Sequence, residues 1–453
     1  ITLDAGSGYS SYLWSNGSTV HTININSSGT YSVSVTDNNN CSGSDNIAIN
    51  TISCNNSTPK TYVPDDNFEA YLETHNSYGQ TVSLGDPSSM GDGIANNDSV
   101  LTANINNVDT LNIKNLNISD VTGILNFDSL IYLNCAENQI STLDVSQNTA
   151  LTYLSCYDNL LSNLDVSQNT GLTYLACGKN QLTALNLTQN TLLTTVDCWK
   201  NNIVNIDISQ CVNLQNLYCS YNQINSINIS NNTQLSNFEI KYNNLTSVDL
   251  TNIGNLSRLN VDNNQLTTLD ISHQTSLQQL YCGKNQLSNL NLNNNTQLQR
   301  VDCDGNQLSS IDLSNNSLLR DFDCHDNSIS NLNLSSNTGL KYLYCQNQNN
   351  QLTSLEITNN PQLIQLNCSN NQITCLRIVN LLANSLDLYV NGNQNLTCIE
   401  VDDPNYANSN WQSGTWNYAT NCNYSAGCFP RVSNSTRTYV PDNNFEAYLE
   451  ANN

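Results

Sequence analysis

The sequence predicts a mainly β solenoid, in which short coils of chain stack on one another. A 21-residue pattern, LxxLxCxxNxLxxLDVSxNTx, repeats twelve times between residues 130 and 385, and each copy opens with a Leu at position 1. Positions 4 and 6 are apolar between polar neighbours, which is the period-two signature of a half-buried strand. A single coil cannot bury its own apolar residues, so we expect the coils to share one core.

Two further positions describe the interior of the coils. Position 9 is Asn in every copy from Asn138 to Asn371, with Asn350 assigned to it after a two-residue insertion around 346–350. Amide side chains can bond the backbone of neighbouring coils, so we predict a structural column. Position 6 is Cys in ten copies and Ile240 or Val261 in the other two. This choice of small apolar residues predicts buried free thiols rather than disulfides or metal ligands.

The repeat resembles the 21-residue bacterial leucine-rich-repeat class called IRREKO. The segments TYVPDDNFEAYLE at 61–73 and NISDVTGILNF at 117–127 resemble the N-terminal cap and first coil of secreted Bacteroidetes repeat proteins. The segment LTCIEVDDPNYANSNW at 396–411 resembles their C-terminal cap. The resemblance implies a leucine-rich-repeat (LRR) solenoid in an extracellular, cell-surface protein of the modular adhesin type, commonly exported by the type IX secretion system.

The N-terminal segments differ from the repeats. Residues 1–53 alternate apolar and polar residues in short runs, and they resemble part of an Ig-like or PKD-like β-sandwich with Trp14 in its core. Residues 54–60 form the expected linker. Pro64, Asp65 and Asp66 open a short helix whose apolar stripe can cover the first coil. Residues 61–129 are therefore predicted to form a short helical N-terminal cap and the first coils.

The C-terminal segments follow twelve coils over 130–385. Residues 386–430 are the expected C-terminal cap, and residues 431–437 a second linker. Residues 438–453 match residues 61–76 at 13 of 16 positions, which predicts the start of a second repeat domain in a tandem array. Near the end of the repeats we expect at least one disulfide, which suits an oxidising compartment, among Cys375, Cys398, Cys422 and Cys428.

Composition argues against several classes of function. The formal net charge is −24, from 37 acids against 13 bases, so nucleic acid and anionic lipid are disfavoured as partners. No run of about 18 apolar residues is present, so we expect no membrane insertion in this segment. Nucleophile, zinc and phosphate-loop motifs are missing from the sequence, and its four His residues are scattered. The chain is predicted not to be an enzyme and to need no cofactor.

The outward positions of the strand, 2, 3, 5, 7 and 8, are the candidate ligand-binding face. They are rich in Tyr, Trp and Arg, which anchor interfaces because they offer large, rigid contact areas. The contrasting position 15 is an acidic column interleaved with Asn. An alternative interpretation is that Tyr merely suits strands and that the bases relieve acidic crowding. The candidate residues are Tyr132, Tyr153, Tyr157, Tyr174, Trp199, Tyr218, Tyr221, Tyr242, Arg258, Tyr281, Arg300, Tyr342 and Tyr344.

Two oxygen-rich groups are candidates for calcium, which prefers carboxylate and carbonyl ligands. The first is Asp302, Asp304, Asp323 and Asp326, with His325 between them and Arg300 and Arg320 nearby. Salt bridges are the alternative interpretation for this group. The second is the loop GDGIANNDS at 91–99, through Asp92, Asn97 and Asp98.

These observations favour a non-enzymatic binding or adhesion module that presents its strand face to a glycan or a protein. Neighbouring tandem modules of the same chain are further expected partners. The first alternative is a passive spacer or filament-forming unit of a surface fibre. The second is a non-catalytic region of a large secreted hydrolase.

Overall fold

A computed structural model describes residues 1–50, 58–379, 381, 386–410 and 423–425. The chain divides into two compact units, Ile1–Pro59 and Lys60–Asn453. Several predicted features lie outside the described residues. These are most of the first linker, the second linker at 431–437, the second cap at 438–453, and the cysteines Cys422 and Cys428.

The first unit consists of short antiparallel strands. β1 (Thr2–Asp4) pairs with β3 (Thr22–Asn24), and β2 (Ser11–Trp14), β4 (Gly29–Thr36) and β5 (Ser42–Ile49) form a three-stranded sheet. Trp14 is buried with Ile23 and Ile25, as its predicted core role requires. Its indole nitrogen donates to the carbonyl of Val20 at 2.8 Å, so the buried polar atom is satisfied.

The second unit begins with a small helical segment. β6 (Lys60–Tyr62) pairs antiparallel with β7 (Ser99–Leu101), and the helices are α1 (Asp66–Thr74) and α2 (Thr102–Ile105). The Asp65 carboxylate starts α1 by accepting from the backbone nitrogens of Asn67 and Phe68, both at 3.1 Å. Phe68 and Leu72 are fully buried and belong to the same apolar core as the coils. The apolar stripe of α1 therefore extends the solenoid core.

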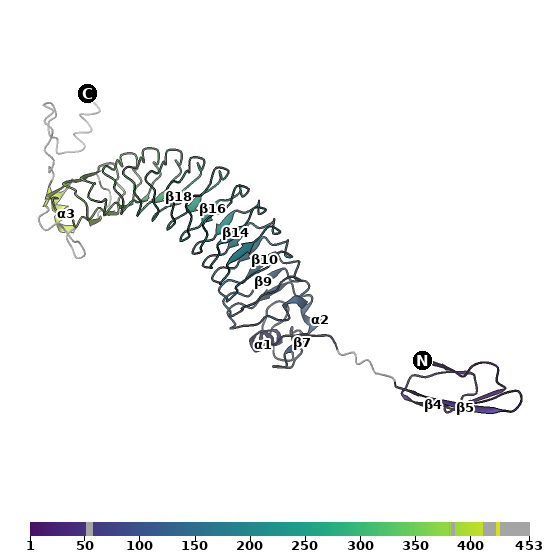
Figure 1. Ribbon diagram of the computed structural model, residues 1–453. Coiled ribbons are helices and arrows are strands. Elements are labelled where there is room, and N and C mark those ends of the chain that lie inside the picture. The colour runs from purple at the N-terminus through teal and green to yellow at the C-terminus, as the bar shows by residue number, and fades with distance from the viewer. Residues whose placement is uncertain (51–57, 380, 382–385, 411–422, 426–453) are drawn as a thin grey trace, which may run out of the picture. The chain divides into compact units, whose positions relative to one another are not determined.

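The coils of the second unit stack along a curved axis, and each adds one strand to a 14-stranded parallel sheet (Figure 1). A short 3-10 helix, η1 (Ile124–Asn126), precedes the regular coils. Paired residues in the regular coils are 21 apart, as in Tyr153 opposite Tyr132 and Tyr174. The strands of this main sheet are β8 (Thr110–Asn112), β9 (Tyr132–Asn134), β10 (Tyr153–Ser155), β11 (Tyr174–Ala176), β13 (Thr195–Asp197), β15 (Asn216–Tyr218), β16 (Asn237–Glu239), β17 (Arg258–Asn260), β18 (Gln279–Tyr281), β19 (Arg300–Asp302), β20 (Asp321–Asp323), β21 (Tyr342–Tyr344), β23 (Gln365–Asn367) and β25 (Asp387–Tyr389).

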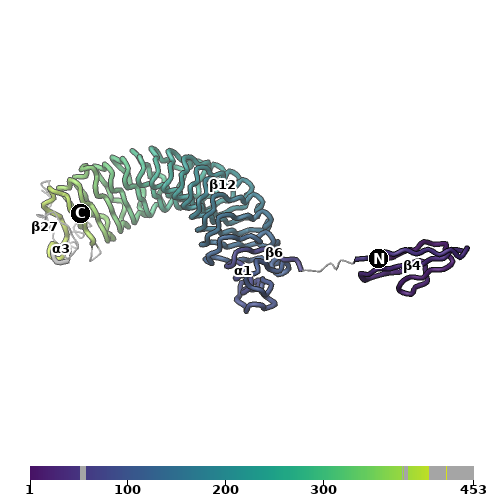
Figure 2. Tube along the Cα trace, turned by 60° about the horizontal axis from the view of Figure 1, so that its bottom comes forward, coloured from purple at the N-terminus to yellow at the C-terminus, as the bar shows by residue number. Residues whose placement is uncertain are grey.

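A second set of parallel strands, which the sequence did not reveal, forms later in some coils. These strands start at position 13 or 14 in the repeats, and Figure 2 shows β12 and β27 from a second direction. The helix α3 (Pro404–Asn410) follows the last coils. The strands of this second set are β12 (Ala184–Asn186), β14 (Asn205–Asp207), β22 (Ser354–Ile357), β24 (Cys375–Ile378), β26 (Cys398–Val401) and β27 (Asn423–Ser425). The predicted mainly β repeat solenoid is confirmed.

The column of amides at position 9 connects each coil to its neighbours. Asn159 is typical, because its Nδ2 donates to the carbonyls of Cys135 at 3.0 Å and Cys156 at 3.1 Å. Its Oδ1 accepts from the backbone nitrogen of Ile140 at 2.9 Å. The side chain therefore bonds to the preceding coil through both its oxygen and its nitrogen, and to its own coil through the nitrogen.

One residue assigned to this column was wrong. Gln348, not Asn350, occupies the column after the insertion, because its Nε2 donates to the Cys324 carbonyl at 2.7 Å and its Oε1 accepts from Ile329 at 2.9 Å. Asn350 is exposed instead. The longer Gln side chain keeps the two bonds to the preceding coil but lacks the bond that Asn makes to the position-6 carbonyl of its own coil. Gln348 follows Cys345 at the usual spacing, so the extra residues lie after the column rather than before it.

A second buried amide column at position 19 was not predicted. Asn169 donates through Nδ2 to the carbonyls of Val145 and Asn148, both at 2.9 Å, and its Oδ1 is buried without a partner in the described residues. The sequence pattern shows this Asn but gives no sign that its side chain turns inward.

The acids at position 15 have a local role. The Asp144 carboxylate accepts from the backbone nitrogen of Ser146 at 2.9 Å, as in an Asx turn.

The ten thiols at position 6 are buried and free, as predicted. Burial raises the pKa of Cys135 to about 12, so the thiols stay protonated. Near the end of the repeats, Cys398 is disulfide-bonded, whereas Cys375 is a free thiol. Within the described residues, no helix has both the length and the apolar character needed to cross a bilayer.

Candidate functional site

Three tyrosines at position 3 form a stack on the strand face. The rings of Tyr132 and Tyr153 have centroids 4.2 Å apart, and those of Tyr153 and Tyr174 are 4.5 Å apart, with interplanar angles of 13° and 3°. The 21-residue register places these rings over one another on β9, β10 and β11. Tyr153 is half-buried, and this partial burial raises the pKa of its hydroxyl. The rings cover each other's faces, so the stack presents ring edges and hydroxyls to solvent.

The residue at position 8 adopts a left-handed backbone in every coil from Glu137 to Asn370, with φ between 50° and 58°. Glycine and Asn tolerate this conformation, whereas other side chains cost about 1–2 kcal/mol there. Several coils accordingly use Asn or Gly, as in Asn263 and Gly305. The other coils do not: they hold Glu137, Asp158, Lys284 and Asp326, and an unbroken run of four coils holds Lys179, Lys200, Tyr221 and Tyr242.

These four residues belong to a continuous aromatic–lysine ridge. Its ring contacts are Trp199 with Tyr221, edge to face at 5.7 Å, and Tyr221 with Tyr242, stacked at 4.4 Å. Tyr221 is 38% exposed and Tyr242 is 41% exposed. The ridge consists of Tyr157, Lys179, Trp199, Lys200, Tyr221, Lys241 and Tyr242.

Lysine ammonium groups lie against the rings of the ridge. Lys179 Nζ is 5.4 Å from the Tyr157 centroid and 3.1 Å from an oxygen of Asp158. The ammonium of Lys200 is 5.8 Å from the ring of Trp199, its neighbour in the chain. Within about 6 Å, such contacts are favourable cation–π interactions.

Two further contacts complete the ridge: one joins neighbouring coils, and the other depends on a glycine. Lys241 Nζ is 5.7 Å from the Tyr221 centroid, so the cation of one coil covers a ring of the coil before it. A Cβ on Gly178 would come within 3.1 Å of Cδ2 of Tyr157 and 2.9 Å of the Trp199 carbonyl. Gly178 therefore leaves the space that Tyr157 occupies.

A second cationic group lies farther along the sheet. The guanidinium carbons of Arg258 and Arg300 are 4.7 Å and 5.4 Å from the centroid of Tyr281, which therefore contacts both. Arg258 Nε also donates to Glu239 at 2.7 Å. The remaining predicted residues, Tyr218, Tyr342 and Tyr344, are half-buried on the same face. Tyr344 donates to Gln365 at 2.9 Å.

The first calcium candidate is arranged around a histidine. His325 Nδ1 lies 2.6 Å from Asp323, and its Nε2 lies 3.4 Å from Asp304 and 3.5 Å from Asp326. Burial and the neighbouring carboxylates raise the pKa of Asp302. These distances favour the ion-pair alternative, with His325 rather than Arg300 or Arg320 lying among the carboxylates.

The second calcium candidate is also internally bonded. The buried Asp92 carboxylate lies 2.6 Å from Lys60 Nζ and accepts from Asn97 Nδ2 at 3.1 Å. Asp98 instead lies beside Asp66 and Glu69, with one oxygen of each within 4.8 Å of the others. Glu69 already accepts from the backbone nitrogens of Asn97 and Asp98 at 3.0 and 3.2 Å. Its carboxylate therefore has a structural role in holding the loop.

The fold and its exposed strand face define the chain as a leucine-rich-repeat solenoid. Among solved structures it is similar to the functional domain of InlJ from Listeria monocytogenes, which includes a cysteine ladder. The identity is 28% and the TM-score 0.59, over 78% of this chain and 79% of that chain. The present chain has its own column of ten buried thiols at position 6.

Two further structures share the fold. An internalin, InlF from Listeria monocytogenes, has 20% identity and a TM-score of 0.57, over 79% of this chain and 96% of that chain. An LRR protein of Leptospira interrogans has 24% identity and a TM-score of 0.52, over 55% of this chain and 69% of that chain. No family model and no curated protein matches the chain.

Proposed function

We propose that the chain is a non-enzymatic binding module of an extracellular bacterial surface protein, and that the aromatic–lysine ridge anchors a protein ligand. The observation that supports this most directly is the run of four bulky residues at position 8. Strained backbone is retained where the side chain is needed, and such sites concentrate at functional surfaces. Of the eight coils outside this run, four hold Asn or Gly at position 8, two hold Asp, and Glu137 and Lys284 are the two long side chains.

The alternative that Tyr is present for strand propensity does not apply to the ridge. The main-sheet strands in these coils end at position 5, as β15 does at Tyr218, and Tyr221 lies beyond that end. Nor do its lysines simply neutralise acids. Lys200 and Lys241 direct their ammonium groups at rings, and only Lys179 is paired with a carboxylate in the described ion pairs.

The choice of a protein ligand follows from how the rings are covered. A sugar stacks on an open ring face, whereas here ammonium groups or other rings lie against the faces of Tyr157, Trp199 and Tyr221. Ring edges, hydroxyls and cations are typical of protein interface anchors. The other predicted parts are included in the proposal. They are an Ig-like first domain, a capping role for α1, and contact with tandem modules of the same chain.

Arrays of bacterial and host surface proteins, probed beside a glycan array, test this proposal. We expect a protein ligand whose capture falls at least about tenfold in the double variant Tyr221→Ala/Tyr242→Ala, as for interface anchors. Tyr78→Ala is the matched control, because Tyr78 is 85% exposed and outside the ridge. Equal melting temperatures would show that both proteins are folded. Absence of any array ligand, or capture that survives the double variant, would instead favour a passive spacer.

A further inference from the structure

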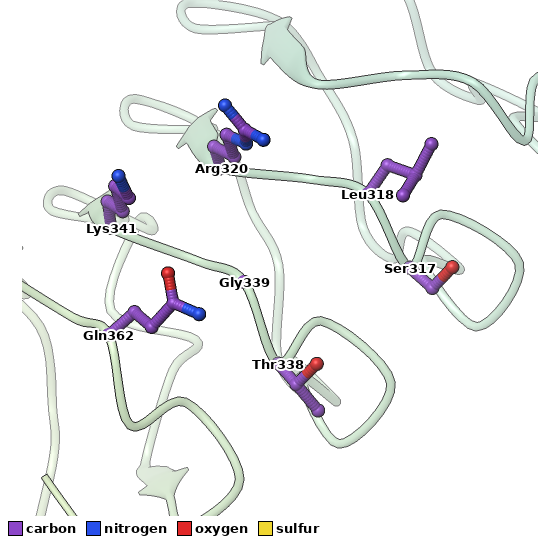
Figure 3. Close-up of a pocket in the computed structure, with 7 residues that line it drawn as sticks. All are labelled: Ser317, Leu318, Arg320, Thr338, Gly339, Lys341 and Gln362. Atoms are coloured by element: carbon purple, nitrogen blue, oxygen red, sulfur yellow. The ribbon is translucent and has the colours of Figure 1, made fainter. Parts of the chain in front are cut away.

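A small pocket lies on the flank of the solenoid, where the chain enters the strands β20 and β21 (Figure 3). Its volume is about 230 Å³. This is smaller than the roughly 300–1,000 Å³ of pockets that enclose drug-sized molecules, so it suits one unit of a larger ligand. The pocket is formed by coil positions 20, 21 and 2, before the strands begin, whereas the ridge lies beyond their ends.

Two cations on adjacent coils border the pocket. Arg320 and Lys341 both occupy position 2, and the backbone nitrogen of Lys341 donates to the Arg320 carbonyl at 2.8 Å. In the coils from 152 to 299 the same position holds only Thr, Ser or Gln. The cations are therefore an exception to the repeat.

The cations of the pocket are not neutralised by neighbouring acids. The lining includes no Asp or Glu, although the chain has 37 acids and 13 bases. Lysine and arginine ion pairs among the described residues involve other cations, namely Lys60, Lys114, Lys179, Arg258, Lys284 and Arg377. Arg320 and Lys341 are thus available to an external anion.

A glycine opens the space between the cations and the neighbouring coil. Gly339 is at position 21, where other coils carry Leu192 or Leu318. A Cβ built on Gly339 would meet nothing nearer than the Leu319 carbonyl at 3.7 Å, which is ordinary contact. Its backbone therefore tolerates a side chain. The hollow therefore exists because position 21 of this coil is glycine, where other coils hold a leucine side chain.

We propose that this pocket binds an acidic sugar residue, with Arg320 and Lys341 holding its carboxylate or sulfate group. Charge-assisted bonds from Arg and Lys to such oxyanions are the strong hydrogen bonds of protein surfaces. Ser317 and Thr338 offer hydroxyls and Gln362 an amide at the rim (Figure 3). These groups can form hydrogen bonds with the hydroxyls of a sugar ring. An Asp or Glu side chain of a peptide ligand would instead bind only the two cations and leave the rim groups without partners from the ligand.

Saturation-transfer NMR with sodium glucuronate tests the proposal on the whole chain. We expect saturable binding with a Kd of about 1–10 mM, and binding of glucose at least about tenfold weaker because it lacks the charge. Arg320→Gln and Lys341→Gln should each weaken glucuronate at least about fivefold. Gln occurs at the same position in other coils, at Gln278 and Gln299, so both variants should fold.

Gly339→Leu is the decisive variant, because it fills the hollow and keeps both cations. It should abolish binding, whereas Gly171→Leu, at the same position of a coil with no such cations, should not. Lys200→Gln in the ridge should also leave glucuronate binding unchanged, so the pocket and the proposed protein-binding ridge can fail separately. No saturable binding, unchanged binding in Gly339→Leu, or equally tight binding of N-acetylaspartate would each overturn the acidic-sugar assignment.

Discussion

Tyr221 and Tyr242 stack with ring centroids 4.4 Å apart, although both hold a left-handed backbone, with φ of 58° and 53°. An aromatic pair contributes about 0.5–1.5 kcal/mol beyond the area it buries. That is close to the cost of about 1–2 kcal/mol for one bulky side chain in this conformation. The pair thus leaves part of the strain uncompensated, and the rings remain exposed for contact with a ligand.

Exchanging residues at position 8 should separate strain from binding. Asn263→Lys places a side chain that disfavours φ of 53°, and we expect it to lower the free energy of unfolding by about 1 kcal/mol. Lys200→Asn should change it by less than about 0.5 kcal/mol, because relief of strain offsets the lost cation–π contact. Urea unfolding gives both values. A Lys200→Asn protein that binds its protein ligand normally would argue against the role of the ridge.

The amide column predicts unequal effects for two neighbouring residues. Gln348→Ala removes partners from the Ile329 nitrogen and the Cys324 carbonyl, and should cost about 2–4 kcal/mol, since buried polar groups lose their bonds. Asn350→Ala should cost about 1 kcal/mol or less, because the residue is exposed and the change loses only a solvent-exposed hydrogen bond from Gln372 Nε2 and meets a left-handed backbone. Thermal melting ranks the two. The reverse order would restore Asn350 to the column.

Thiol labelling should distinguish the buried column from the other cysteines. At pH 8 in native conditions, iodoacetamide should modify Cys41, which is exposed, and Cys375, which is partly exposed. Cys135 and Cys368 should not react, because burial raises the pKa of each to about 12 and blocks access. Peptide mass spectrometry identifies the modified sites. Labelling of the column before unfolding would show that the coils open readily.

Stability should fall as pH rises through a defined range. Burial, with a smaller contribution from Asp304, raises the pKa of Asp262 to about 6. The folded chain therefore keeps a proton that the unfolded chain has lost, so this group destabilises the fold increasingly between about pH 4 and 6. Asp262→Asn should remove on the order of 1–2 kcal/mol of that loss at pH 7, measured by urea unfolding across the range.

Asp312→Asn is the control, because the pKa of Asp312 is shifted downwards whereas that of Asp262 is shifted upwards. The hydrogen bond from the Ser314 backbone nitrogen lowers the pKa of Asp312. The Asp312 carboxylate therefore stabilises the fold above the usual pKa of an Asp, and this stabilisation is lost only as pH falls through the lowered pKa. This variant should leave the slope between pH 4 and 6 unchanged. A wild-type slope that Asp262→Asn does not reduce would mean that other groups dominate the pH response.

The periodic residues made the fold predictable, whereas the site depended on details of the backbone. Position 4 and the thiols at position 6 identify the strand and its buried side, and Asn159 represents a column that any stacked coil requires. The left-handed conformation at position 8 was not predictable, because the column mixes Glu, Asp, Lys, Tyr, Asn and Gly. The amide at position 9 after the insertion was ambiguous, since Gln348 and Asn350 have the same functional group.

Other features depended on contacts between residues far apart in the sequence. The bridging role of His325 follows from three carboxylates, of which Asp304 belongs to the preceding coil. The pocket at Gly339 combines small and charged residues from adjacent coils, none of which forms a recognised motif. Such sites arise from side chains that interrupt the repeat.

The 21-residue register that the main sheet keeps from β9 to β21 has a genetic consequence. Each coil contacts chiefly its neighbours, so gaining or losing 63 bases, three for each of the 21 residues, would insert or delete one complete coil between intact ones. The spacing between ridge and pocket would then change by one strand separation, about 4.8 Å. Recombination between copies could thereby adjust the distance between two binding groups without requiring a new fold.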